Sequence, residues 1–212
     1  MTDIADPERA LVLAYAPAER REALTVLWRL DERLGGIVAA TREAMIGRIR
    51  LAWWREALEA LDTAEPPAEP LLRDIAHDIL TLGISGTDLA AIEGGWAALI
   101  DEPDIDTYAR ERGGTLFTLA ARILGGSAAD VARAGEGWAL ADLAHRSTEP
   151  ALCAAARSAA QARLADPPRL PPRLRALGAL TTLARRDARA ESRQQGAPGR
   201  VARILWYRLT GR

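Results

Sequence analysis

The chain of 212 residues contains no lysine, one cysteine and two histidines, and each scarcity excludes a class of chemistry. All 28 basic residues are arginine, so Schiff-base catalysis, a pyridoxal-phosphate lysine and a P-loop lysine are excluded. Because Cys153 stands alone, the chain forms no internal disulfide and no cysteine metal cluster. His77 and His145 by themselves leave little room for a zinc enzyme.

Long apolar runs and a targeting pattern are also missing. No apolar stretch approaches the roughly 20 residues that a transmembrane helix needs. The acidic start "MTDIADPERALVLAYA" lacks the basic region of a signal peptide. The net charge of -1 gives no general attraction to nucleic acid or to an anionic membrane. We therefore expect a cytoplasmic protein that does not bind nucleic acid.

Apolar residues make up 49% of the chain and recur at spacings of three and four almost throughout. This period is typical of amphipathic helices, and the alternation expected of β-strands is missing. We predict an all-α protein that forms a single domain over residues 1–212. Turn segments such as "TAEPPAEP", "GISGTD" and "DPPRLPP" separate the predicted helices. These cover residues 7–15, 18–39, 42–62, 69–82, 87–100, 105–124, 128–146, 150–165, 172–194 and 198–209.

The segment "RIRLAWWREAL" at residues 48–58 places one charge on the wrong side of a helix. On a helical wheel its apolar arc contains Leu51, Trp53 and Trp54, and Arg50 lies inside that arc. A guanidinium is always charged and costly to bury. Arg50 is therefore expected to have an anionic partner, either a protein carboxylate or a ligand.

The preceding predicted helix repeats the anomaly with a carboxylate. Asp31 projects from an apolar arc that includes Leu27 and Trp28. Asp31 and Arg50 are equally far from the turn near Thr41, so an antiparallel hairpin would set them at the same height. Two interpretations stay open. The pair is a buried salt bridge that fixes helix pairing, or Arg50 binds a diphosphate and Asp31 holds a metal that bridges to it.

Two further acidic segments are weaker candidates. In "EGWALADLAHRST", Asp142 shares a face with Trp138 and is either another cavity acid or a buried carboxylate paired with Arg146 or another arginine. In "DIAHD", Asp74 and Asp78 are four residues apart and share one helical face. That spacing is common on solvated helices, so we do not expect a metal site there.

Several segments, taken in order, resemble one protein family. "DPERALVLAYAPAERREALTVLWRLDERLGGIVAATREAMIGRIRLAWWREAL" resembles the N-terminal half of the squalene/phytoene synthases. "IDTYARERGGTLFTLAARILG" resembles their Tyr-x-x-x-x-(Ala/Gly)-Gly helix, and "GWALADLAHRSTEP" falls where their second acidic motif belongs. "PGRVARILWYRLTGR" resembles the closing helix of divergent bacterial members. Within the family, the chain is most similar to the branch that includes the respiratory complex I assembly factor.

The resemblance implies an isoprenoid-synthase-type helical bundle around a central cavity. In active members, two Asp-x-x-x-Asp motifs bind Mg²⁺ ions, which hold the diphosphate of an allylic prenyl substrate. Carried onto this sequence, the resemblance implies three metal ligands: Asp31, Glu32 and Asp142. It further implies that Arg50 binds the diphosphate and that Tyr108 lines the cavity.

The sequence departs from this pattern where the second acid of each motif belongs. One turn after Asp31 stands Gly35, and one turn after Asp142 stands Arg146. A single carboxylate holds a cluster of hydrated Mg²⁺ ions poorly. The departures therefore indicate a catalytically degenerate member of the family.

Three functions follow as hypotheses. The first is a degenerate member that binds an isoprenoid or diphosphate ligand, or that assists assembly of a respiratory complex at the periphery of a membrane. The second is an active Mg²⁺-dependent prenyltransferase that condenses prenyl diphosphates into squalene- or phytoene-like products. The third is a helical interaction scaffold without a ligand. The sequence does not determine the oligomeric state.

Overall fold

The computed structural model describes residues 4–127, 130–167 and 169–211, and within these ranges the chain forms helices and no β-strand. The α-helices are α1 (Pro7–Leu13), α2 (Ala18–Ala40), α3 (Ala44–Ala60), α4 (Pro70–Asp78), α5 (Gly86–Ala97), α6 (Ile105–Thr107), α7 (Thr115–Ile123), α8 (Val131–Arg146), α9 (Pro150–Arg163), α10 (Arg175–Asp187) and α11 (Pro198–Thr210). Two short 3₁₀ turns are η1 (Leu80–Leu82) and η3 (Pro172–Leu174), and η2 (Tyr108–Gly114) is a π-helix. The prediction of an all-α protein is confirmed.

Most predicted helices lie within a few residues of their expected bounds. The largest difference concerns the predicted helix 172–194, because α10 ends at Asp187 and a loop leads from there to α11. The predicted helix 105–124 is one continuous run, but it winds as a π-helix between Tyr108 and Gly114. Residues 128 and 129 of the predicted helix 128–146 lie outside the described residues.

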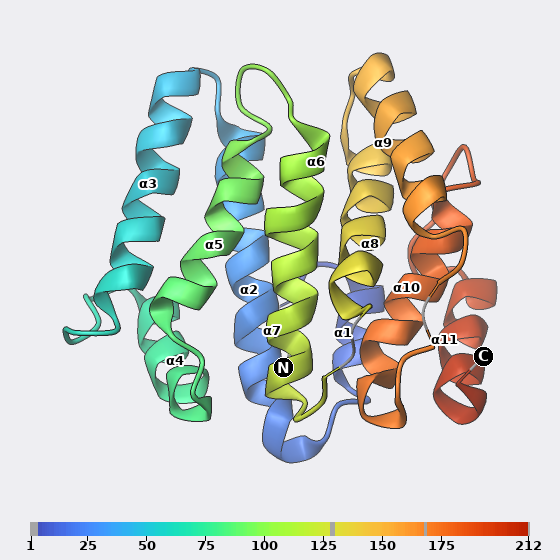
Figure 1. Ribbon diagram of the computed structural model, residues 1–212, viewed down its shortest axis with the longest axis horizontal. Coiled ribbons are helices and arrows are strands. Elements are labelled where there is room, and N and C mark those ends of the chain that lie inside the picture. Colours follow the sequence, from blue (N-terminus) through green and yellow to red (C-terminus); the bar gives the residue numbers. More distant parts are fainter. Residues whose placement is uncertain (1–3, 128–129, 168, 212) are drawn as a thin grey trace.

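The helices stand side by side in an elongated array (Figure 1). α3 lies at one end of the long axis, α10 and α11 lie at the other, and α2, α7 and α8 lie between them. α3 packs chiefly against α5, and α8 packs against η2, α9 and α10. Within the described ranges, every helix is too short or too polar to traverse a bilayer.

An aromatic cluster occupies the middle of the array. The ring of Trp28 on α2 is edge-on to those of Phe117 on α7 and Trp138 on α8, with ring centroids 6.3 and 5.2 Å apart. The centroids of Phe117 and Trp138 are 5.4 Å apart. Edge-on packing of this kind is a favourable arrangement of aromatic quadrupoles. The cluster forms a rigid apolar wall beside the charged residues described below.

Only half of the predicted apolar arc of α3 is buried. Leu51, Trp54 and Leu58 face the core, whereas Ile49 and Trp53 are exposed. α3 has neighbours on one side only, because it lies at the end of the array (Figure 1). The prediction that the whole arc, including its central arginine, is buried was therefore wrong.

Two glycines allow η2 and α8 to cross closely. A Cβ added to Gly135 would overlap the carbonyl oxygen of Gly113, and a Cβ on Gly113 would overlap that of Gly135. We expect Gly135→Ala to lower the free energy of unfolding by about 1–3 kcal/mol through overpacking. Gly36→Ala is the matched control, since its added Cβ would meet no atom within 4 Å, and it should raise stability by about 1 kcal/mol. Urea denaturation of both variants measures their free energies of unfolding. Equal changes in Gly135→Ala and Gly36→Ala would contradict the close crossing as the reason for glycine at position 135.

Candidate functional site

Asp31 lies on the buried side of α2, as its position in the apolar arc predicts. Its carboxylate is 0% exposed. Oδ1 accepts hydrogen bonds from Nε of Arg112 at 2.7 Å and from the indole Nε1 of Trp96 at 3.0 Å. Oδ2 accepts from Nη2 of Arg112 at 2.8 Å and from Nη1 of Arg9 at 3.3 Å. Both oxygens are thus taken by protein donors.

Asp142 on α8 is the second buried carboxylate, at 2% exposed. Oδ2 accepts from Nη2 of Arg9 at 3.2 Å and from Nη2 of Arg112 at 3.1 Å. Oδ1 accepts from Nε of Arg146 at 3.0 Å and from both Nη atoms of Arg193 at 3.2 Å. The predicted pairing of a buried Asp142 with Arg146 or another arginine is confirmed, and four arginines share this carboxylate.

Two guanidinium groups join the two carboxylates into one closed unit. We call this unit the central ion cluster, and it consists of Asp31, Asp142, Arg9 and Arg112. The guanidinium carbon of Arg112 lies 4.2 Å from the ring centroid of Trp96 and 4.7 Å from that of Trp138. The corresponding carbon of Arg9 lies 4.9 Å from the ring centroid of Trp138. Arginine over the face of tryptophan is favourable where both are shielded from water, so the aromatic wall supports the cluster.

The arginines keep both carboxylates ionised. Burial by itself would raise the pKa of Asp31, but the attraction of Arg112 and then of Arg9 outweighs it and lowers that pKa. Burial likewise opposes ionisation of Asp142. Its pKa is nevertheless lowered by the charges of four arginines, in decreasing order Arg9, Arg112, Arg146 and Arg193. The pKa of Arg112 is raised despite burial, chiefly by the charge of Asp31. The cluster is therefore a fixed set of ion pairs at any pH near neutrality.

Arg112 reaches the cluster from the π-helix η2. π-helical segments are rare and often occur at functional sites. Nη1 of Arg112 donates to the hydroxyl of Tyr108, which is fully buried. Burial raises the pKa of Tyr108, so its hydroxyl stays protonated. The structure thus places Tyr108 beside the central ion cluster, with its ring edge-on to that of Trp96 at a centroid distance of 5.6 Å.

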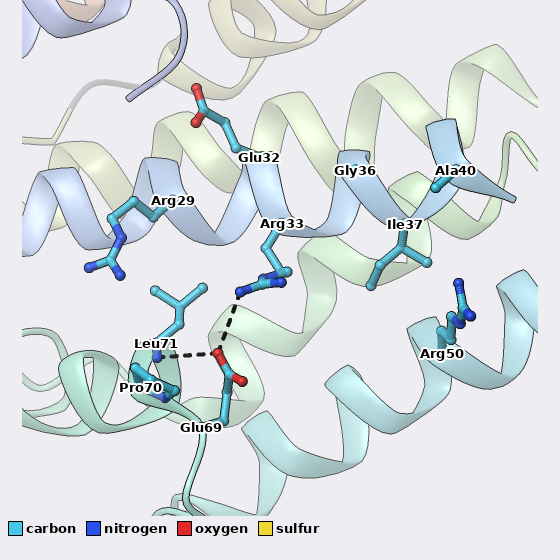
Figure 2. A pocket seen from close by; sticks show the side chains of 10 residues that line it. All are labelled: Arg29, Glu32, Arg33, Gly36, Ile37, Ala40, Arg50, Glu69, Pro70 and Leu71. Carbon is cyan, nitrogen blue, oxygen red and sulfur yellow. Dashed lines mark hydrogen bonds and ion pairs between the residues drawn. The ribbon is translucent and has the colours of Figure 1, made fainter. Parts of the chain in front are cut away.

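Arg50 and Asp31 do not form the predicted pair. Arg50 is exposed and lines an open groove of about 650 Å³ between α2, α3 and α4, across from Ile37 (Figure 2). In the same groove, Nη2 of Arg33 lies 3.6 Å from Oε1 of Glu69. The prediction that Arg50 and Asp31 meet was wrong because α3 packs chiefly against α5 rather than α2. A role for Arg50 in binding a diphosphate stays a prediction.

The sequence prediction missed three arginines of the site: Arg9, Arg112 and Arg193. Arg112 follows Tyr108 by four residues in "YARERGG", which gives a weak helical signal that both lie on one face. Arg9 carries no such signal. The bond from Arg9 to Asp31 spans 22 residues of chain and the bond from Arg112 to Asp31 spans 81, and a local sequence pattern does not reveal contacts over such separations.

A pocket of about 550 Å³ lies against the central ion cluster. Arg146 and Arg193 contribute to its lining, and Arg146 is about half-exposed. Glu32, which the sequence predicts as a metal ligand, also lines this pocket. Its Oε2 accepts from the backbone N–H of Ala5 at 3.3 Å, and its Oε1 lies 3.9 Å from Nη1 of Arg9. The three predicted metal ligands thus share one region, and arginines separate them.

These carboxylates do not fit a Mg²⁺ site. Mg²⁺ needs nearly octahedral oxygen ligands at 2.0–2.1 Å, supplied by carboxylates with free lone pairs and by water. The oxygens of Asp31 and Asp142 instead accept bonds from Arg9, Arg112 and other donors. In the part of the chain that the structure describes, no three Asp, Glu, His or Cys side chains are grouped to hold one ion.

A second buried ion cluster ties the ends of the chain together. Nη2 of Arg200 on α11 donates to Oε2 of Glu8 on α1 at 2.7 Å and to Oδ2 of Asp187 at the end of α10 at 2.9 Å. Nearby, Nε2 of Gln195 donates to Oδ2 of Asp6 at 2.7 Å. These contacts hold the loop between α10 and α11 against α1, and that loop carries Arg193 to the central ion cluster.

Comparison with known proteins agrees with this architecture. The sequence model described as squalene/phytoene synthase matches residues 4–162, a span that contains Asp31 and Asp142 and ends within α9. α10 and α11 lie outside the matched span. No curated protein and no solved structure matches the chain. Because the matched span exceeds half of the 212 residues, the chain belongs to the squalene/phytoene synthase family.

Proposed function

We propose that this protein is a catalytically inactive member of the squalene/phytoene synthase family that acts by binding rather than by prenyl transfer. The observation that supports the proposal is the closed contact of Asp31 and Asp142 with Arg9 and Arg112. In active members the two acidic positions hold Mg²⁺. In this chain guanidinium groups lie between them and neutralise them without a metal.

Displacing the arginines to admit a metal would be costly. Arg112 is fully buried and cannot lose its proton. If Asp31 turned to a metal ion, the guanidinium would remain buried without its main partner. Removing one partner of a buried ion pair costs about 3–5 kcal/mol. The ion cluster therefore favours a metal-free site.

The pocket beside the central ion cluster is the candidate site for an anionic group such as the diphosphate of an isoprenoid. Arg146 contacts Asp142 through Nε, so its Nη groups are available to a ligand in the pocket. Arg193 lines the same pocket. Guanidinium groups bind phosphate oxygens in a bidentate manner and need no Mg²⁺ to do so.

Turnover and binding assays test this function together. Incubation with farnesyl or geranylgeranyl diphosphate and Mg²⁺ should release no diphosphate. Calorimetric titration with farnesyl diphosphate in EDTA should show binding that Arg146→Met weakens about tenfold, as expected for the loss of one charged hydrogen-bonding partner. Arg48→Met is the control, because Arg48 pairs with Asp101 on the surface of α3.

Two contrary outcomes are distinct. Mg²⁺-dependent diphosphate release that disappears in Asp31→Asn would establish the alternative of an active prenyltransferase. No turnover and no binding would leave the helical scaffold without a ligand as the function.

Assistance in assembly of a respiratory complex is a second candidate, and the surface of α11 supports it. Leu205, Trp206 and Leu209 are exposed on this helix, which contains no acidic residue. An amphipathic helix with exposed apolar and arginine side chains is typical of contact with an anionic membrane surface. The peripheral membrane contact that the resemblance implies would use this face.

A further inference from the structure

The outer side of α3 carries an apolar stripe that no other helix within the described residues covers. We call it the outer stripe, and it consists of Met45, Ile46, Ile49 and Trp53. These side chains are 69%, 43%, 61% and 48% exposed. Their spacing places them on one side of the helix, opposite Leu51 and Leu58, which face the core. Neighbouring apolar residues at this level of exposure are typical of an interaction site.

Charges of opposite sign lie at the two ends of the outer stripe. Arg42 lies two residues before the start of α3, next to the N-cap Glu43, and Glu56 lies near its last turn. Both residues are exposed, and neither has an ion pair within the described ranges. On a helical wheel Glu56 falls within the same sector as Ile49 and Trp53. The stripe therefore runs from a cation, through apolar side chains, to an anion.

This arrangement is complementary to itself. If a second α3 is laid antiparallel with Ile49 at the height of its own copy, Met45 stands at the height of Trp53. The same operation sets Arg42 at the height of Glu56, once at each end. A two-fold interface uses one patch on both subunits, so that patch must complement itself when reversed. Most surface helices, if paired antiparallel with their own copy, would place like charges opposite each other or apolar side chains opposite charged ones.

We propose that α3 is a homodimer interface in which the outer stripes of two copies pack antiparallel about a two-fold axis near Ile49. The position of α3 at the end of the array leaves room for a second molecule to approach (Figure 1). Self-complementarity of charge selects a second copy of this chain over an unrelated partner. This dimer does not rest on the function proposed above.

The size of α3 sets the expected strength of the dimer. α3 has 17 residues and is therefore about 25 Å long. One helix face of this length offers less than the roughly 800 Å² per partner of a standard stable interface. We therefore expect a dissociation constant in the micromolar range, and a monomer–dimer equilibrium rather than a permanent dimer.

Sedimentation equilibrium over micromolar concentrations tests the proposal. Wild-type protein should show a monomer–dimer equilibrium, and Ile49→Asp should weaken it at least about tenfold by burying a charge at the axis. Arg42→Glu and Glu56→Arg should each weaken it, because each sets like charges opposite one another. The double variant should recover the dimer. An equimolar mixture of the two single variants should form a heterodimer, since both ends again pair opposite charges.

Controls separate a loss of interface from a loss of fold. Leu209→Asp changes an exposed apolar residue on α11 and should leave the dimer unchanged, and all variants should keep the wild-type circular dichroism. In a Cys153→Ala background, Ile49→Cys should form an inter-chain disulfide on oxidation. A monomer at every concentration would overturn the proposal and leave the outer stripe to a different protein. A dimer that is insensitive to Ile49→Asp and to both charge reversals would overturn it as well.

Discussion

Replacing Arg112 with methionine is expected to lower the free energy of unfolding by about 3–5 kcal/mol, the usual cost of breaking a buried ion pair. Methionine keeps the length of the side chain but removes its donors. Oδ1 of Asp31 would retain only the bond from Nε1 of Trp96, and Arg9 would be the one cation still shared by Asp31 and Asp142. Urea denaturation at neutral pH measures the loss.

The pH dependence of that loss distinguishes an ion cluster from simple packing. In the wild type the pKa values of Asp31 and Asp142 are lowered, so the cluster stabilises the protein above the unfolded-state pKa of about 3.9 and loses this contribution as pH falls below it. In Arg112→Met, protonation relieves the uncompensated carboxylates. The difference in the free energy of unfolding between Arg112→Met and the wild type should therefore become smaller as pH falls from 7 towards 4.

The control for this experiment is the exposed pair of Arg48 on α3 and Asp101. Arg48→Met should cost under about 1 kcal/mol, because water screens surface ion pairs. If Arg112→Met costs no more than this control, or if its cost does not change with pH, Asp31 and Asp142 do not depend on Arg112 for their charge. The central ion cluster would then not explain why the site excludes a metal.

Replacing Arg200 with methionine is expected to loosen the attachment of α11 and to lower the free energy of unfolding by about 2–3 kcal/mol. Arg200 bonds to Glu8 and Asp187, so its loss leaves two carboxylates without their shared cation. The ring end of Tyr207 lies close to Gly178, and this contact between α11 and α10 would remain. The effect should therefore concentrate in residues 198–210.

Hydrogen exchange locates that effect. The amides of α11 should exchange faster in Arg200→Met, while those of α2 and α8 should keep their protection. Arg203→Met is the matched control, because Arg203 lies on the same helix and is exposed. Equal exchange in the two variants, or loss of protection throughout the molecule, would show that the Glu8–Arg200–Asp187 contacts do not hold α11 as a separate element.

The sequence by itself determined the helical class of this protein and the burial of its key acids. A period of three and four is a local property, and it predicts helices without knowledge of their neighbours. Asp31 stands in the middle of an apolar arc, and the arc faces the core as expected. Asp142 and Arg146 are four residues apart, so their contact on one helix face also followed from spacing. The family resemblance rested on the same segments.

Apart from Arg146, tertiary structure alone decided which cations contact those acids. Arg9, Arg112 and Arg193 come from three separate segments, and no periodicity relates them to Asp31 or Asp142. It also decided that α3 buries Leu51 and Leu58 while Ile49 and Arg50 face solvent, because an apolar arc wider than one contact surface does not specify which part is covered. Helix packing made that choice. Local sequence sets which faces can be buried, and only the arrangement of neighbouring helices settles which of them are.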